Sequence, residues 1–479
     1  MGWQWLHFLP HGLVILTGVL ALFASAHVIL SKKEVGAAAA WVGFIWFVPF
    51  LGILLYLLLG INRIQRKAAR LNRIRRRSTT MLPVVELSAK LGPECSYMLS
   101  LAHLTNHVAR RSLTCGNAVT PLVSGDSAYP AMLAAIEDAE VSISLCSYIF
   151  DNDSVGKQFA EALARAKNRG VAVRVLVDAV GARYSWPRSV FSLLQSARVR
   201  SARFLPTRVP WRIPYSNLRN HRKVLVVDGR RGFTGGMNIR QGSQSREDRG
   251  PKIEDLHFAF EGPVVTHLQE SFAEDWVFST GERLDGKAWF PDILPQSEVL
   301  ARGISDGPDE DFDTLRWVYL GGINCARDRV RIVTPYFLPD APLFSALGSA
   351  ALRGVAIDIV LPAQNNLALV QWASMAMLWQ VLEHGCRVWL TPPPFDHSKL
   401  MVVDGCWSFI GSGNWDTRSL RLNFEFNVEC YDAVLGQRLE HIAARKIESA
   451  TPLSLDDVDG RSLPVKLRDG AARLLTPYL

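Results

Sequence analysis

Two segments, far apart in the chain, repeat one spacing of residues that can do chemistry. A histidine, a lysine and an aspartate fall at i, i+2 and i+7 in both: His221, Lys223 and Asp228, then His397, Lys399 and Asp404. An asparagine follows each histidine by 17 residues, after a glycine-rich run: Asn238 in the first copy and Asn414 in the second. A single copy would be ordinary, whereas two copies with the same downstream element indicate a functional site.

The chemistry expected of these residues is attack on a phosphodiester. Four apolar residues follow each lysine and predict a buried strand, so each histidine and its lysine point to the same face. One histidine can attack phosphorus while the other protonates the leaving oxygen, and nearby donors stabilise the phosphoryl oxygens. Such a site needs no metal and no other cofactor. The expected substrate-binding residues are Asn238, Asn414, Gly236 and Ser412.

An attacking imidazole must also be oriented through its other ring nitrogen. Glu425 lies 28 residues after His397 within an apolar run, and it is the candidate for the second copy. Asp255 lies 34 residues after His221 and is the candidate for the first copy, with Glu254 as the alternative. A solvated charge is the competing interpretation of Asp255.

The elements that position these residues also occur twice. Each copy reads as strand, helix, glycine and strand: 141–149, 155–169, Gly170 and 171–177, then 330–336, 343–353, Gly354 and 355–361. In this alignment Tyr148 corresponds to Tyr336. The repetition predicts a duplicated α/β fold, with a pseudo-twofold axis that brings equivalent points to a shared face. The expected limits of the two domains are 121–285 and 286–479, the second with a C-terminal tail.

The first 62 residues contain two apolar stretches, 13–30 and 35–59, without Lys, Arg, Asp or Glu. About 20 helical residues cross a hydrocarbon core of ~30 Å, so both stretches are long enough to span it. The turn at 31–34 is short enough to force a hairpin. Pro49 is tolerated if the carbonyl that it frees finds another partner. The sequence therefore predicts a transmembrane helical hairpin over residues 1–62.

Basic charge is concentrated directly after this hairpin, in a predicted juxtamembrane segment and connection over 63–120. Eight basic residues and no acidic one lie between 63 and 77, and they account for the whole formal net charge of +8. The neutral remainder argues against nucleic-acid binding. The positive-inside rule predicts a cytoplasmic body and N-terminus, and the basic run can hold anionic lipids. A signal peptide cleaved after residues 24–26 is the competing interpretation, although no Lys or Arg precedes the apolar stretch.

The seven cysteines are odd in number and widely spaced, with no Cys-x-x-Cys pair. This pattern predicts neither a disulfide framework nor a zinc site, and it fits a reducing compartment.

The paired motifs resemble the phospholipase D superfamily, and the wider sequence resembles its bacterial cardiolipin synthases. The similar segments cover nearly the whole chain: the N-terminal hairpin and its basic run, 148–150, 170–173, 261–263, 272–276, 334–337, 414–419, 423–425 and 472–477. This resemblance implies two phospholipase D-like domains, each a sheet layered with helices. It also implies a multi-pass protein of the bacterial inner membrane, with phosphatidylglycerol and anionic lipids as partners.

The resemblance also implies roles for the residues. His221 attacks the phosphatidyl group to form a phosphohistidine, and His397 acts as acid and then base, although the sequence leaves open which histidine does which. The phosphate is held by Lys223, Lys399, Asn238 and Asn414, while Asp228 and Asp404 support the architecture. A second phosphatidylglycerol accepts the group, giving cardiolipin and glycerol.

The chain departs from the family where a Trp-Arg-Asp run is common, because Ile253, Glu254 and Asp255 stand there after a charged loop. The departure bears on the acceptor more than on the chemistry. Alternatives are phosphatidylethanolamine as a donor, hydrolysis as in phospholipase D, and a phosphatidylserine-synthase-like activity. A nuclease and a non-catalytic membrane scaffold are further alternatives, and the two complete motifs argue against the scaffold.

Overall fold

A computed structural model describes residues 5–32, 35–60, 91–185, 189–206, 218–244, 252–308 and 313–476. The basic run at 63–77 lies outside the described residues. The chain divides into two compact units: residues 1–70 with 207–217, and residues 71–206 with 218–479. Each unit is described by itself.

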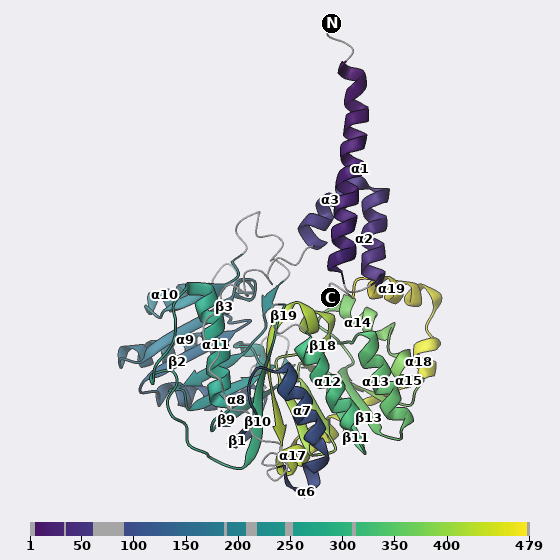
Figure 1. The fold of residues 1–479 in the computed structure, drawn as a ribbon. Coiled ribbons are helices and arrows are strands. Elements are labelled where there is room, and N and C mark those ends of the chain that lie inside the picture. Colours follow the sequence, from purple (N-terminus) through teal and green to yellow (C-terminus); the bar gives the residue numbers. More distant parts are fainter. Residues whose placement is uncertain are drawn as a thin grey trace. The chain divides into compact units, whose positions relative to one another are not determined.

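The described part of the N-terminal unit is helical (Figure 1). Its elements are α1 (Trp5–Ser31), α2 (Val35–Phe47), α3 (Pro49–Leu55) and the π-helical turn η1 (Tyr56–Gly60). Ala21 and Val28 of α1 are buried against Ile45 and Tyr56. The ring nitrogen Nδ1 of His27 lies 2.6 Å from the Tyr56 hydroxyl and ties α1 to the turn. Among the described residues, one helix is long and apolar enough to cross a membrane, with its most apolar window at Val14–Ser31.

The second apolar stretch is not the single helix that the sequence predicts over 35–59. Helix α2 ends at Phe47, and Val48 has φ −135°, outside the helical range. Proline fixes its own φ and lacks an N–H, so Pro49 begins a new helix instead of continuing the old one. A Cβ added to Gly52 would lie 2.7 Å from the Phe44 carbonyl oxygen, which shows that α3 folds back against α2.

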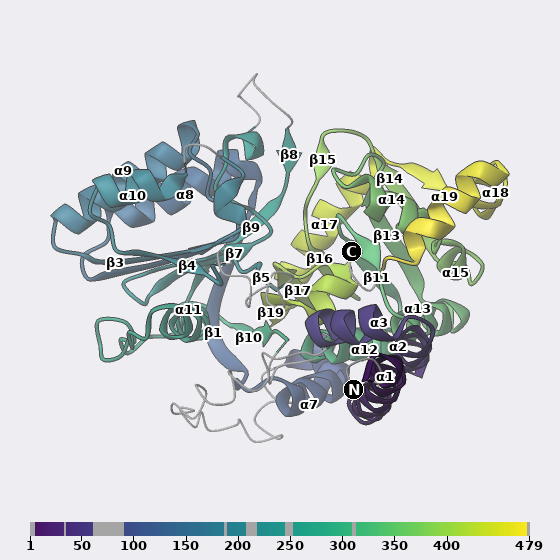
Figure 2. The same ribbon diagram turned by 90° about the horizontal axis from the view of Figure 1, so that it is seen from above.

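The described residues of the second unit form one mixed sheet of 16 strands, with helices on both faces (Figure 2). Its first copy contributes β1 (Thr114–Val123), β2 (Ser142–Ser147), β3 (Ala172–Asp178), β4 (Ser201–Phe204), β6 (Val224–Val227), β7 (Arg231–Gly235) and β9 (Leu256–Glu261). Its second copy contributes β10 (Val299–Asp306), β11 (Arg329–Val333), β13 (Ala356–Pro362), β14 (Arg387–Thr391), β16 (Leu400–Val403), β17 (Trp407–Gly411), β19 (Asn423–Tyr431) and β20 (Thr451–Leu453).

The strand order repeats and confirms the predicted duplication. The first half runs β1-β9-β7-β6-β2-β3-β4, and the second runs β10-β19-β17-β16-β11-β13-β14 and then β20. Antiparallel pairing of β1 with β10 joins the halves into one sheet. Strands β2 and β3 are parallel, as are β11 and β13, and both pairs match the buried strands expected from the sequence. Gly170 and Gly354 end the intervening helices at φ +100° and +94°, values that suit glycine.

Helices bury the two faces of each half. The first copy carries α8 (Ser124–Glu137), α9 (Ser154–Asn168), α10 (Val190–Ser196) and α11 (Val265–Thr280). The second carries α12 (Thr314–Cys325), α13 (Ala341–Leu352), α14 (Ala368–Met375), α15 (Trp379–Leu382), α16 (Thr417–Arg421), α17 (Ala433–Glu448), α18 (Leu455–Asp459) and α19 (Leu463–Arg473). Two further helices, α6 (Gly92–Cys95) and α7 (Leu99–Val108), precede β1, and α7 packs into the core of the second copy. The predicted domain limits at 121, 285 and 286 remain predictions, because both copies belong to one compact unit.

The structure corrects the prediction drawn from the cysteines. Cys95 of α6 and Cys406, in the turn between β16 and β17, form a disulfide across 311 residues of sequence. The cysteines at 146, 325, 386 and 430 form no disulfide with any residue that the structure describes. Spacing along the chain gave no sign of the pair, because tertiary folding alone brings α6 to this turn.

Candidate active site

Two short parallel strand pairs join the copies at the motifs. Strand β5 (Arg219–Asn220) pairs with β19, and the His221 backbone N–H donates to the Phe424 carbonyl at 2.9 Å. Strand β15 (Phe395–Asp396) pairs with β8 (Ile253–Glu254), and the His397 N–H donates to the Glu254 carbonyl at 2.7 Å. Each histidine is thus fixed to a strand of the other copy, immediately before that copy's acidic residue.

The histidine of each copy faces the carboxylate of the other copy. His221 Nδ1 lies 3.1 Å from the Glu425 carboxylate, and His397 Nδ1 lies 2.7 Å from Asp255 Oδ2. The expected pairing of Glu425 with His397 and of Asp255 with His221 is therefore wrong. The residues were well chosen, but the short cross-copy strands present each carboxylate to the opposite motif. Asp255 is 3% exposed, so it is no solvated charge, whereas the alternative Glu254 has a side chain 53% exposed that pairs with Lys446.

Glu425 is held by a dense set of donors. Its carboxylate accepts from the Ser412 hydroxyl at 2.5 Å, the Ser419 hydroxyl at 2.9 Å and the Asn423 amide at 3.1 Å, besides facing His221. Burial raises the pKa of the carboxyl, but its interactions with His221, the charge of Lys223 and the hydrogen bond from Ser412 outweigh burial, so the pKa lies below its usual value. Glu425 is therefore a fixed anion behind His221.

Asp255 has fewer partners. Besides His397, it accepts from the backbone N–H of Leu256 at 2.8 Å. Burial raises its pKa to about 6, against the opposing charge of Lys399. A Cβ on Gly236 would lie 2.2 Å from Asp255 Oδ1, so glycine leaves the space that this carboxylate fills. The equivalent position in the second copy is Ser412, because it follows Gly411 as Gly236 follows Gly235. Its hydroxyl donates a hydrogen bond to Glu425, the carboxylate of its own copy.

Both motif lysines are buried beside their histidines. Lys223 Nζ donates to the His221 carbonyl at 2.6 Å, and Lys399 Nζ makes the equivalent bond to the His397 carbonyl. Burial lowers the pKa of Lys223 to about 7 and that of Lys399 to about 8, although Glu425 and Asp255 oppose the shift. Each lysine therefore lies beside its histidine, as the sequence predicts.

The electrostatics show that the motifs lie together. Burial lowers the pKa of His397, and the charges of Lys399 and of Lys223 in the other copy lower it further. Burial likewise lowers the pKa of His221, with Lys399 of the other copy among the causes. Both imidazoles are therefore neutral near pH 7, and their bonds from Nδ1 leave Nε2 for chemistry. Two lysines and two carboxylates balance in charge, so a bound phosphodiester makes the site anionic.

Asp228 and Asp404 lie at the other end of their strands from the histidines. Seven residues of extended chain span roughly 20 Å, which takes both carboxylates out of reach of the imidazoles. Asp228 accepts from the backbone N–H groups of residues 140, 141 and 142 at 2.8–3.0 Å. Asp404 accepts from those of residues 327, 328 and 329 and from the Tyr97 hydroxyl at 2.8 Å. Both also have φ +52° in the turn that leaves the motif strand.

The two asparagines differ in their surroundings. Asn238 Oδ1 accepts from the Ile149 N–H at 3.0 Å, which leaves its amide N–H₂ to donate. Asn414 is 3% exposed, and its Oδ1 has no hydrogen-bond partner among the described residues. Within the described residues, no hydrogen bond joins either asparagine to the histidines.

Three side chains at the site were not among the predicted site residues. The Tyr148 ring lies 5.0 Å from the His221 ring, and the Tyr336 ring lies 6.2 Å from that of His397. Tyr148 and Tyr336 occupy equivalent positions in the two copies, and this equivalence is the sequence signal that could have identified them. Arg222, inside the first motif, donates to the Glu425 carbonyl at 3.1 Å and pairs with Asp275 at 2.8 Å, which ties the copies together. The second motif has Ser398 at this position, so the repeat gave no sign of Arg222.

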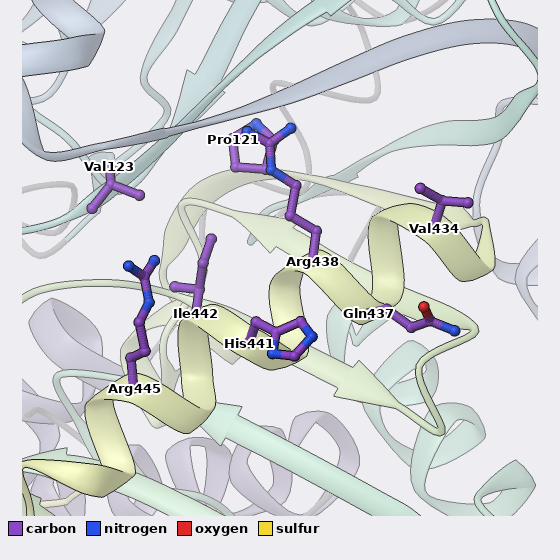
Figure 3. A pocket seen from close by; sticks show the side chains of 8 residues that line it. All are labelled: Pro121, Val123, Val434, Gln437, Arg438, His441, Ile442 and Arg445. Carbon is purple, nitrogen blue, oxygen red and sulfur yellow. The ribbon is translucent and has the colours of Figure 1, made fainter.

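A groove of about 400 Å³ between β1 and α17 contains none of the motif residues (Figure 3). Figure 3 shows two arginines projecting from α17 toward β1, with Ile442 between them. The lining residues are Pro121, Val123, Val434, Gln437, Arg438, His441, Ile442 and Arg445.

Comparisons with known proteins agree with this geometry. The family described as "Cardiolipin synthase, PLD-like domain" matches residues 132–276 and 319–447, one match in each copy. The family described as "Phospholipase_D-nuclease N-terminal" matches residues 19–60. The structure of a phosphatidylserine synthase from Haemophilus influenzae superposes with a TM-score of 0.61 over 79% of this chain and all of that one, at 14% identity, and so shares the fold.

Full-length relatives extend the match to the whole chain. A cardiolipin synthase A of Pseudomonas putida (strain GB-1) is 32% identical over 98% of this chain and 97% of its own length. A cardiolipin synthase of Geobacillus thermodenitrificans is 30% identical over 97% of this chain and 93% of its own length. With matches in both copies and in the N-terminal segment, the chain belongs to the cardiolipin synthase family of proteins with two phospholipase D-like domains.

Proposed function

We propose that this chain is a cardiolipin synthase, which transfers a phosphatidyl group from one phosphatidylglycerol to another. The observation that carries the proposal is the exchanged pairing of two neutral histidines with buried carboxylates, beside two lysines, at the junction of the two copies. Two histidines around one phosphorus supply both a nucleophile and a proton donor.

In the first step, His221 Nε2 attacks phosphorus and the bond to the glycerol headgroup oxygen breaks. The attacking imidazole becomes positive, and the Glu425 anion behind it stabilises that charge, which favours His221 as the nucleophile. His397 donates a proton from Nε2 to the leaving oxygen. The pKa of His397 is low in the free enzyme, but an anionic phosphodiester beside it favours the protonated form.

In the second step, the hydroxyl of another phosphatidylglycerol attacks the phosphohistidine. His397 accepts the hydroxyl proton, the P–N bond to His221 breaks, and cardiolipin leaves. Lys223 and Lys399 stabilise the phosphoryl oxygens in both steps, helped by the side-chain amides of Asn238 and Asn414. The backbone N–H groups of Gly236 and Ser412 already donate to the Leu256 and Phe426 carbonyls, so these two residues shape the site without binding the phosphate. Asp228 and Asp404 serve the fold, consistent with their bonds to backbone N–H groups.

Product analysis tests this function. The full chain in detergent micelles with phosphatidylglycerol, without added metal, should give cardiolipin and glycerol in equal amounts by mass spectrometry. Phosphatidylethanolamine as a competing lipid tests the alternative donor. Phosphatidic acid as the sole product would instead make the enzyme a hydrolase.

For the membrane, we propose that residues 1–62 form a two-span hairpin in the inner membrane, with the body in the cytoplasm. The basic run after the second apolar stretch supports this side. The Cys95–Cys406 bond argues for the other side, because disulfides rarely persist in a reducing compartment. Labelling intact cells with an impermeant maleimide distinguishes the two orientations. In the proposed one, a Lys32→Cys variant should react from outside, whereas a cysteine in the body should not. The reverse pattern would place the body outside.

A further inference from the structure

Helix α19 exposes leucines on the side opposite its packed face. Leu463 and Leu467 of the helix are 68% and 65% exposed, and Leu474, which directly follows the helix, is 75% exposed. Their spacing places the three leucines along one stripe. Asp469 and Ala472 on the other side are buried. The helix therefore has a packed face and an apolar face that no other part of the described structure covers.

Basic residues flank the exposed stripe. Lys466 and Arg473 are exposed next to the leucines. The one acidic residue of α19, Asp469, is buried and paired with Arg461 and Arg468. The outward face of the helix is thus apolar at its centre and cationic at its edge, while the aspartates of this region belong to the preceding helix, α18.

This surface extends to the wall of the active site. Helices α19 and α14 pack side by side (Figure 1). Leu367, directly before α14, and Leu369, in its first turn, are both exposed. Ala472 of α19, Val370 of α14 and Tyr336 share one apolar cluster. The Tyr336 hydroxyl donates to Asn366 Oδ1 at 2.8 Å, directly before the exposed leucines, and its ring lies beside His397.

We propose that this surface, called here the leucine surface (Leu367, Leu369, Leu463, Leu467 and Leu474), inserts into the headgroup region of an anionic phospholipid bilayer. An apolar stripe with cationic edges is the pattern of a helix that lies in a membrane interface. Anionic lipids attract the flanking lysine and arginine. Docking would bring the mouth of the site to the depth of the scissile phosphates. The inference rests on the proposed function, because that function requires a substrate embedded in the bilayer.

Spin labelling measures the docking directly and needs no activity. The full chain with Leu467→Cys is labelled and placed in nanodiscs that contain phosphatidylglycerol, and the signal of the labelled wild type is subtracted. The label should be accessible to oxygen and protected from a water-soluble nickel chelate. The matched control is Leu352→Cys, an equally exposed leucine at the end of α13, which should be accessible to the chelate.

Each possible combination of oxygen and chelate accessibility at residue 467 either supports or overturns the proposal. Access of the chelate to the label at 467 would show that the surface stays in water, and would overturn it. Protection from both oxygen and chelate would show a protein contact, such as a second copy of the chain, and would also overturn it.

Kinetics provide an independent test. The triple variant Leu463→Gln, Leu467→Gln and Leu474→Gln should lose about tenfold in activity on nanodiscs but remain within about twofold of wild type in mixed micelles, where docking is not needed. Equal losses in both would contradict docking. Lys466→Gln with Arg473→Gln should weaken activity on anionic nanodiscs, whereas the charge-matched control in the groove of Figure 3, Arg438→Gln with Arg445→Gln, should not. Failure of the wild type to form cardiolipin in micelles would refute the proposed function and leave the labelling result standing.

Discussion

The two histidine sites share a plan but differ in how their carboxylates are held. Glu425 behind His221 accepts from three side chains, and its pKa lies below the usual value. Asp255 behind His397 accepts from one backbone N–H, and burial raises its pKa to about 6. A fixed anion suits an imidazole that becomes positive by attacking phosphorus. A carboxyl that titrates near neutrality suits a histidine that takes up and releases a proton. The duplicated halves therefore give their histidines unlike surroundings, which fit the two different roles proposed for them.

The largest expected effect comes from exchanging each histidine for asparagine. His221→Asn and His397→Asn should each lower cardiolipin formation by at least about 10³-fold, because one loses the nucleophile and the other the proton donor. A phosphatidyl ester of p-nitrophenol separates them, since this leaving group needs no proton. His397→Asn should release one equivalent of nitrophenol in a burst and retain a phosphohistidine detectable by mass spectrometry, and His221→Asn should do neither. A burst from His221→Asn alone would reverse the assignment.

The pH dependence of kcat/KM in micelles should distinguish the carboxylates. Asp255 must be ionised to orient His397, so activity should fall as pH drops through about 6. Lys223 loses its charge as pH rises through about 7, which gives the alkaline limb. Asp255→Asn should lower kcat/KM about 10²-fold and remove the acidic limb. Glu425→Gln should cause a similar or larger loss but keep that limb, because Glu425 is already ionised. Loss of the acidic limb in Glu425→Gln instead would contradict the comparison.

The sequence predicted the residues of the site better than their partners. Repeated spacing identified both motifs and the strands beside them, because periodicity and glycine caps are local signals. The pairing of Asp255 with His397 and of Glu425 with His221 was not local: the partners lie 142 and 204 residues apart, and strands β5 and β8 are only two residues long. The Cys95–Cys406 disulfide was not predicted for the same reason, because its two cysteines are 311 residues apart. The break at Val48 is different: Pro49 was visible in the sequence, but its effect on this apolar stretch depends on packing at Gly52.

A smaller effect is expected where glycine in one copy faces serine in the other. Gly236→Ser would place a Cβ 2.2 Å from Asp255 Oδ1, so the carboxylate must move away from His397. Activity should fall by roughly 10- to 100-fold. Ser412→Gly removes one of several donors to Glu425 and should cost only about three- to tenfold. Steady-state rates in micelles measure both, and a larger loss for Ser412→Gly would show that the donors to Glu425 matter more than the space for Asp255.

The smallest effect on catalysis is expected at the aspartates of the two motifs. Each holds three backbone N–H groups at the start of a central strand, far from the imidazoles. Asp228→Asn and Asp404→Asn should each destabilise the fold by about 1–3 kcal/mol and lower the Tm by several degrees, with kcat of the folded enzyme within about threefold of wild type. Asp404→Asn should lower the Tm more, because Asp404 also accepts from Tyr97. Thermal unfolding of the purified variants, beside rates at low temperature, measures both quantities. A rate loss as large as that of the histidine variants, at unchanged Tm, would place these carboxylates in the chemistry.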